Sequence, residues 1–165
     1  MAPATLVFHW RYVILPLVIL ILSVALVTYF FRLLPAEVAY HFEADGSPDE
    51  QMSRGMIILW ALLPQFLLTL LSLAITWGIA KLGSLFRQAE GTGIDLNQVM
   101  LFMGNIVALP QVILCFAMLD IFSYNSYQTH ILPLWVFAII VMVLGAVILG
   151  LFFIRAIRQV SGTSR

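Results

Sequence analysis

Charged residues are scarce in this chain, and their scarcity limits what the protein can be. Only 10% of its 165 residues are Asp, Glu, Lys or Arg, whereas 62% are hydrophobic and the mean hydropathy is +1.05. A soluble domain needs a more polar surface than this composition supplies. The net charge is zero, so the total charge indicates neither a nucleic acid nor an acidic lipid surface as partner. The composition indicates an integral membrane protein.

Cysteine is almost absent as well. The chain has one, Cys115, and a single cysteine cannot form an internal disulfide. This excludes a scaffold held together by disulfide bonds. Cys115 lies within a long apolar segment, where we expect it to serve as a small apolar core residue.

Long apolar segments dominate what is present. A membrane-spanning helix needs about 20 mostly apolar residues to cross a hydrocarbon core of roughly 30 Å. We therefore predict an all-α, polytopic membrane protein in which residues 1–165 form a single domain, a bundle of four transmembrane helices. The predicted spans are residues 12–31, 56–80, 99–119 and 133–154, joined by outer loops at 32–55 and 120–132 and an inner loop at 81–98.

The basic residues are distributed unevenly between the two ends of this bundle. Positive charge accumulates on the cytoplasmic side of membrane proteins, and this rule predicts that both termini are cytoplasmic and that the loop between the first two spans faces outward. The residues on the predicted inner side are Arg11, Lys81, Arg87, Arg155, Arg158 and Arg165, against Arg32 and Arg54 on the outer side.

Ionisable residues are missing from the middle of every predicted span. Proton relays, ion pathways and voltage sensors usually need such residues, so these functions are not indicated. The mid-membrane polar side chains include Gln65, Asn105 and Gln111, for which we expect hydrogen bonds between helices. The alternative is a transporter or enzyme with a solvent-lined cavity that reaches them. No nucleophile with a base, phosphate cradle or cofactor motif is visible, so we expect neither an enzyme nor a cofactor.

The segment from Leu34 to Asp49 interrupts the apolar sequence with polar and turn-forming residues. Gly46 and Pro48 are typical turn residues, and Asp45 and Asp49 can hydrogen-bond to their own backbone. We therefore predict an ordered turn in the outer loop.

A metal site in this turn is the first alternative to consider. One imidazole and several carboxylates fall within ten residues, but zinc would need more nitrogen or sulfur ligands. A calcium loop starting at Asp45 would lack its glycine and its bidentate glutamate, so we predict no metal. We expect His41 to hydrogen-bond to the turn; a contact that responds to pH is the alternative. The acidic residues are Glu43, Asp45, Asp49 and Glu50.

A family resemblance rests on the same segment. Its elements are Leu34-Pro35, His41-Phe42, Gly46-x-Pro48-Asp49 and Ser53-Arg54, followed by a span that contains Leu63-Pro64. This order resembles the bacterial membrane domain of unknown function that opens the SdpI-type immunity proteins. The chain departs from that pattern at Ala39, where proline is usual, at Glu43, where Asn is common, and at Arg54, where Lys is common. The resemblance implies a location in the plasma membrane of a prokaryote.

The function expected from this reading is recognition without catalysis. The outer loop would bind a partner, either a cationic membrane-active peptide, as in immunity, or a sensor protein. The alternative is an accessory or structural subunit of a larger membrane complex. The lipid bilayer is the partner implied by composition, and the oligomeric state stays open. The predicted binding residues of the loop are His41, Phe42, Asp45, Gly46, Pro48, Asp49 and Ser53.

Overall fold

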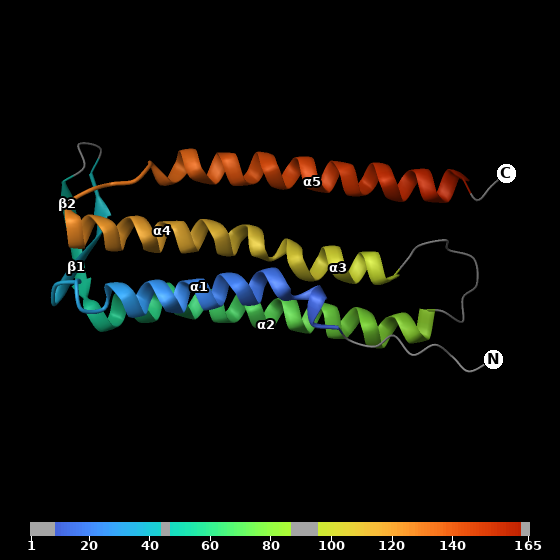
Figure 1. Ribbon diagram of the computed structural model, residues 1–165, viewed down its shortest axis with the longest axis horizontal. Coiled ribbons are helices and arrows are strands. Elements are labelled where there is room, and N and C mark those ends of the chain that lie inside the picture. The colour runs from blue at the N-terminus through green and yellow to red at the C-terminus, as the bar shows by residue number, and fades with distance from the viewer. Residues whose placement is uncertain (1–8, 44–46, 87–95, 163–165) are drawn as a thin grey trace.

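The computed structural model describes residues 9–43, 47–86 and 96–162, and this part of the chain is mostly helical. Figure 1 shows long helices running between two ends of the molecule, with a pair of strands at one end and the last turns of α2 and α5 toward the other. The elements are η1 (Trp10–Tyr12), α1 (Ile14–Phe30), β1 (Glu37–Phe42), β2 (Pro48–Ser53), α2 (Arg54–Phe86), α3 (Leu96–Ile106), α4 (Ala108–Tyr127) and α5 (Leu134–Gly162).

Three helical segments in the described part of the chain are long and apolar enough to cross a membrane. They are Arg54–Leu82 in α2, Asn97–Tyr127 across α3 and α4, and Leu134–Arg155 in α5. The fourth expected span corresponds to α1, which is apolar but has 17 residues. At a rise of about 1.5 Å per residue, α1 is roughly 26 Å long, slightly less than the roughly 30 Å of a hydrocarbon core.

Helix α2 has its polar side chains inside the bundle and its large apolar side chains outside. Gln65, Thr69, Ser72 and Thr76 recur at helical spacing and are at most 4% exposed. Outward-facing residues such as Trp77 are more than half exposed. Water would penalise this arrangement, whereas a lipid environment favours it because buried polar groups can pair with one another and apolar groups can face acyl chains.

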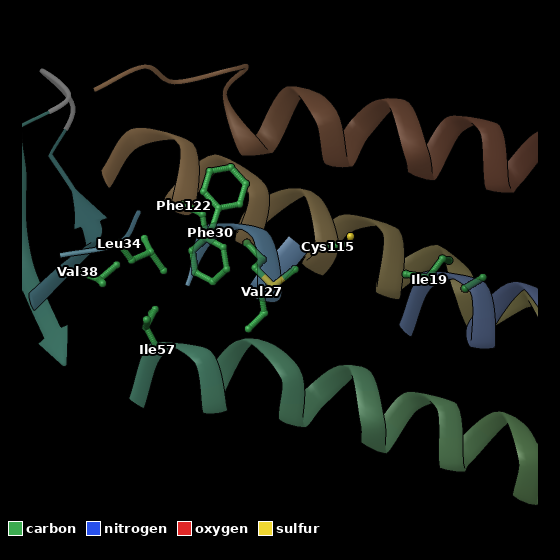
Figure 2. Close-up of a cluster of buried hydrophobic side chains, with 10 residues drawn as sticks. Ile19, Val27, Phe30, Leu34, Val38, Ile57, Cys115 and Phe122 are labelled. Carbon is green, nitrogen blue, oxygen red and sulfur yellow. The ribbon is translucent and has the colours of Figure 1, made fainter. Parts of the chain in front are cut away.

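The main hydrophobic core lies at the strand end and joins the helices to the strands. Figure 2 shows Phe30 of α1 close to Phe122 of α4, with Leu34, Val38 and Ile57 beside them. The two phenyl ring centroids are 5.8 Å apart. Because Val38 belongs to β1 and is completely buried, β1 is part of the core and is not an appended loop.

Several boundaries differ from those expected from the sequence. Residues 120–127, expected in a loop, are helical, and α4 ends where Gln128 adopts a positive φ of 55°. The third span is interrupted between Ile106 and Ala108. Pro110 explains this interruption because it lacks an N–H to donate to the preceding turn. Pro64 also lies within a helix, yet α2 continues through it.

Helix α5 lies at one edge of the bundle and packs on α3 and α4 (Figure 1). Two stacked aromatic pairs hold it there: Phe116–Phe137, with ring centroids 3.9 Å apart, and Phe102–Phe152, at 4.2 Å. Gly145 of α5 meets Leu109, whose side chain would lie 2.7 Å from a Cβ at position 145. The absence of a side chain on Gly145 therefore allows the close approach of α5 to α4.

Candidate functional site

The predicted turn is in fact a β-hairpin in which β1 and β2 pair antiparallel. Ala39 faces Gln51, His41 faces Glu50 and Phe42 faces Pro48, with irregular register on both sides of His41. Asp45 and Gly46, two of the predicted binding residues, lie outside the described residues. The strands differ in burial, because Val38 and Ala39 of β1 are buried while nearly all of β2 is exposed.

Asn125 of α4 fixes the hairpin to the bundle. Its Oδ1 accepts a hydrogen bond from the Ala39 N–H at 2.8 Å, and its Nδ2 donates to the Ala39 carbonyl, also at 2.8 Å. One amide side chain thus satisfies both backbone groups of Ala39, as a neighbouring strand would. Asn125 Nδ2 also donates to the Ile121 carbonyl, which holds the side chain in position on its own helix.

Phe42 of the loop motif is a second anchor. Its ring packs edge-on against Tyr124 and His130, with centroids 4.6 and 4.8 Å away. The imidazole is held in turn by Asp120, whose carboxylate is 3.0 Å from His130 Nδ1 and accepts a hydrogen bond from the Ile131 N–H at 2.8 Å. Phe42 therefore positions the hairpin, and its half-buried ring offers little surface to a partner.

His41 and Asp49 form a pair on the exposed part of the hairpin. His41 Nδ1 lies 3.3 Å from Asp49 Oδ2, and the two side chains are 61% and 37% exposed. Next to them, the Tyr40 hydroxyl donates to the Glu50 carboxylate. This hydrogen bond, together with partial desolvation and the negative charges of Glu50 and Asp49, raises the pKa of Tyr40 above its ordinary value of 10.0. The described residues of the hairpin thus present a largely acidic surface.

Arg54, at the end of the motif, has a structural use. Its guanidinium donates to the carbonyls of Phe31 at 3.1 Å and Leu34 at 3.3 Å, and it lies over the Phe31 ring at 4.7 Å. These carbonyls follow the C-terminus of α1, where a positive charge is favourable. The backbone N–H of Arg54 also closes the neck of the hairpin by donating to Ala36. The preceding Ser53 is exposed.

The predicted intramembrane polar residues fall into two separate places. Gln65 Nε2 donates to the Gln111 carbonyl at 3.0 Å, and Gln111 Nε2 returns the contact to the Gln65 carbonyl at 3.1 Å. Gln111 also donates to Thr69. Asn105 instead binds the start of α1: it accepts from the Leu15 N–H and donates to the Arg11 carbonyl, both at 3.0 Å. These contacts join helices to one another.

The predicted binding residues did not include His130 or Asn125, and Arg54 entered only as part of the family motif. The available signal was weak, because nothing near Asn125 in the sequence indicates a contact with a residue 86 positions away. Among the described residues, no three His, Cys, Asp or Glu side chains come together in a way that could hold a metal ion.

The comparisons with known proteins cover the same region. A family model described as a domain of unknown function (DUF1648) matches residues 18–63, which run from α1 through the hairpin into α2. Its description assigns no activity. No curated protein and no solved structure matches the chain. The match supports the part of the resemblance that concerns a domain of unknown function, and the segment from Leu34 to Pro64 lies almost entirely within the matched residues.

Proposed function

We propose that this protein is a non-enzymatic, four-span protein of a prokaryotic plasma membrane that recognises a cationic, membrane-active peptide at its hairpin, as an SdpI-type immunity protein would. In this proposal both termini are cytoplasmic and the hairpin faces outward. The observation that carries the proposal is the exposed strand β2, which belongs to a hairpin held rigidly by Asn125 and Phe42.

The backbone of β2 offers a place for an extended peptide. Both backbone groups of Ala39 point toward Asn125 and therefore away from β2. Gln51 lies opposite Ala39. Ala39 and Gln51 therefore form a non-hydrogen-bonded pair, in which the N–H and C=O of Gln51 point away from β1. The sheet has two strands, so within the described residues no third strand covers that edge. An extended peptide can add to such an edge through backbone hydrogen bonds.

The charge of the hairpin favours a basic peptide over an acidic one. Glu37, Glu43, Asp49 and Glu50 are all exposed, and Arg54 is turned toward the end of α1. Acidic side chains around an edge strand would attract a cationic peptide and increase its association rate. Binding would then sequester the peptide before it inserts into the bilayer.

The test uses the full-length protein in nanodiscs of zwitterionic lipid and a synthetic Lys-rich membrane-active peptide. Gln51→Pro removes the outward N–H and should abolish binding. Gln51→Ala keeps this N–H and should still bind the peptide. Asp49→Asn together with Glu50→Gln should weaken binding by about tenfold or more, since tenfold corresponds to about 1.4 kcal/mol. Equal affinity of Gln51→Pro and Gln51→Ala, with unaltered circular dichroism, would contradict strand addition.

The accessory-subunit alternative predicts a different result. Trp60, Trp77 and Trp135 are 59–69% exposed, as expected of side chains that face either lipid or a larger complex. A pull-down in mild detergent at native expression level separates the two functions. Stoichiometric recovery of other membrane subunits would support the alternative; recovery of the chain alone, or with a small peptide, supports recognition at the hairpin.

A further inference from the structure

A groove of about 1150 Å³ lies at the end of the molecule away from the hairpin. It is bounded by the start of α1, by α3 and α4, and by α5. Most of its wall is apolar, formed by residues such as Leu15, Leu101, Leu109, Ile148 and Leu151. No part of the proposed peptide site contributes to it.

The polar residues of the groove gather at one end. Arg11, next to α1, and Arg155, near the end of α5, both line it, together with Gln98 of α3. Neither arginine forms an ion pair with a residue that the structure describes. The guanidinium of Arg11 contacts the Tyr12 hydroxyl at 3.3 Å and the face of the Tyr12 ring, contacts that leave its remaining N–H groups available.

The length of the groove matches one leaflet of a bilayer. On α5 its lining extends from Gly145 to Arg155, which at about 1.5 Å per residue is roughly 15 Å. This is about half of a hydrocarbon core of roughly 30 Å. The close contact between Gly145 and Leu109 brings α5 onto α4 at the mid-membrane end of the groove, opposite the end at Arg11 and Arg155.

We propose that this groove binds one anionic phospholipid from the leaflet whose headgroups lie at the level of Arg11 and Arg155. Its phosphate would accept hydrogen bonds from Arg11 and Arg155, because guanidinium groups recognise phosphate through charge-assisted hydrogen bonds. One acyl chain would lie along the apolar wall at Leu109 and Ile148. A zwitterionic lipid would bind less well, since its ammonium group would meet two unpaired positive charges. This site is independent of peptide recognition at the hairpin.

The test measures lipid retained by the purified full-length protein in native mass spectrometry and its thermal stability after addition of phosphatidylglycerol or phosphatidylcholine. We expect one phosphatidylglycerol molecule to be retained and to stabilise the protein more than phosphatidylcholine does. Arg11→Gln with Arg155→Gln should lower the affinity by about tenfold or more, because both charge-assisted hydrogen bonds to the phosphate are removed. The matched control Arg32→Gln removes an exposed arginine that does not line the groove and should change nothing.

A second variant tests the groove without changing charge. Ile148 is 56% exposed and lines the groove, so Ile148→Trp should fill it and reduce lipid retention while the protein still folds. Three results would overturn the proposal. They are equal retention of the two lipids, a loss of lipid affinity with Arg32→Gln equal to that with the two groove arginines replaced, or the same thermal stabilisation by inorganic phosphate as by phosphatidylglycerol. A dimer that Ile148→Trp dissociates would also overturn it, because a second chain would then occupy the groove.

Discussion

At the scale of single residues, Gly104 allows three segments to meet. A Cβ at this position would lie 2.1 Å from the backbone oxygen of Tyr12 and 2.5 Å from Thr76 Cγ2. Ser72 donates to the Gly104 carbonyl at 2.6 Å. The contact therefore joins η1, α2 and α3, and the atom that blocks a side chain belongs to the backbone, which cannot move aside without displacing Tyr12.

Gly104→Ala should destabilise the protein by about 1–3 kcal/mol, the usual cost of inserting a methyl group into a packed site. The matched control is Gly78→Ala on α2, where a Cβ would have nothing within 4 Å and where alanine is the better helix former. The measurement is the free energy of unfolding in mixed detergent micelles. Equal stability of the two variants would contradict the close approach at Gly104.

Tyr40 gives the hairpin a dependence on alkaline pH. Its hydrogen bond to Glu50 raises the pKa of the folded state above 10.0, and the bond exists only while the phenol is protonated. Its stabilising effect is therefore fully present below pH 10 and is lost as the pH rises through the folded-state pKa. The Tyr40→Phe variant should not show this loss of stability at alkaline pH.

Tyrosinate absorbance measures the same property directly. The difference between the titration curves of the unmodified protein and Tyr40→Phe should have its midpoint above pH 10.0. In a Glu50→Gln background the midpoint should move back toward that value, because the charge and the acceptor carboxylate are both removed. A midpoint at or below the ordinary value would show that Tyr40 does not bond to Glu50.

At the scale of elements, apolar runs located the long helices but not their ends. A run of apolar residues is a local property and reports where the membrane lies. Helix α4 continues through polar residues such as Ser123 and Asn125 to Tyr127, because a helix need not stop where the apolar segment does. Asn125, expected in an outer loop, therefore lies on a helix and reaches Ala39 from there.

The hairpin was missed for a related reason. Val38, Tyr40 and Phe42 alternate with other residues, and Asp45-Gly46 is a common hairpin signal, so β1 could have been predicted. The sequence of β2, from Pro48 to Ser53, has no apolar alternation, and its extended form depends on pairing with β1. Strand propensity is strongly dependent on such context. We expected hydrogen bonds between helices for Gln65 and Gln111, but the sequence did not indicate that the two residues would exchange hydrogen bonds with each other.

The side chains of Gln65 and Gln111 make unequal numbers of hydrogen bonds, which predicts which of the two substitutions destabilises the protein more. Gln65→Leu removes one hydrogen bond, to the Gln111 carbonyl, whereas Gln111→Leu removes two, to the Gln65 carbonyl and to Thr69. Each substitution also removes a buried Oε1 that has no partner among the described residues. Gln111→Leu should therefore cost about 0.5–1 kcal/mol more than Gln65→Leu. The free energy of unfolding in mixed micelles measures both costs. A larger cost for Gln65→Leu than for Gln111→Leu would contradict the hydrogen bonds assigned to the two side-chain amides.

At the scale of the whole molecule, α1 is the element that decides the topology. It is shorter than the other candidate spans, but its two ends are tied to distant points of one helical segment that is long enough to cross. Near its start, Leu15 bonds to Asn105, and near its end the Tyr29 hydroxyl lies 3.0 Å from that of Tyr127. Residues 105 and 127 are separated by roughly 33 Å of helix, about the thickness of a hydrocarbon core. We therefore expect α1 to cross wherever Asn97–Tyr127 does.

We therefore expect residues before α1 and residues of the hairpin to lie on opposite sides of the membrane. His9→Cys and Gln51→Cys, each in a Cys115→Ala background, should react with a membrane-impermeant maleimide from opposite sides of sealed vesicles. Thr129→Cys, exposed at the hairpin end, should react from the same side as Gln51→Cys. The native Cys115 is 7% exposed, so its removal should disturb the core little while eliminating background reaction. If His9→Cys and Gln51→Cys react from the same side, α1 does not cross the membrane, and the hairpin shares a compartment with the residues before α1. Reaction from opposite sides requires α1 to be a transmembrane span despite its length.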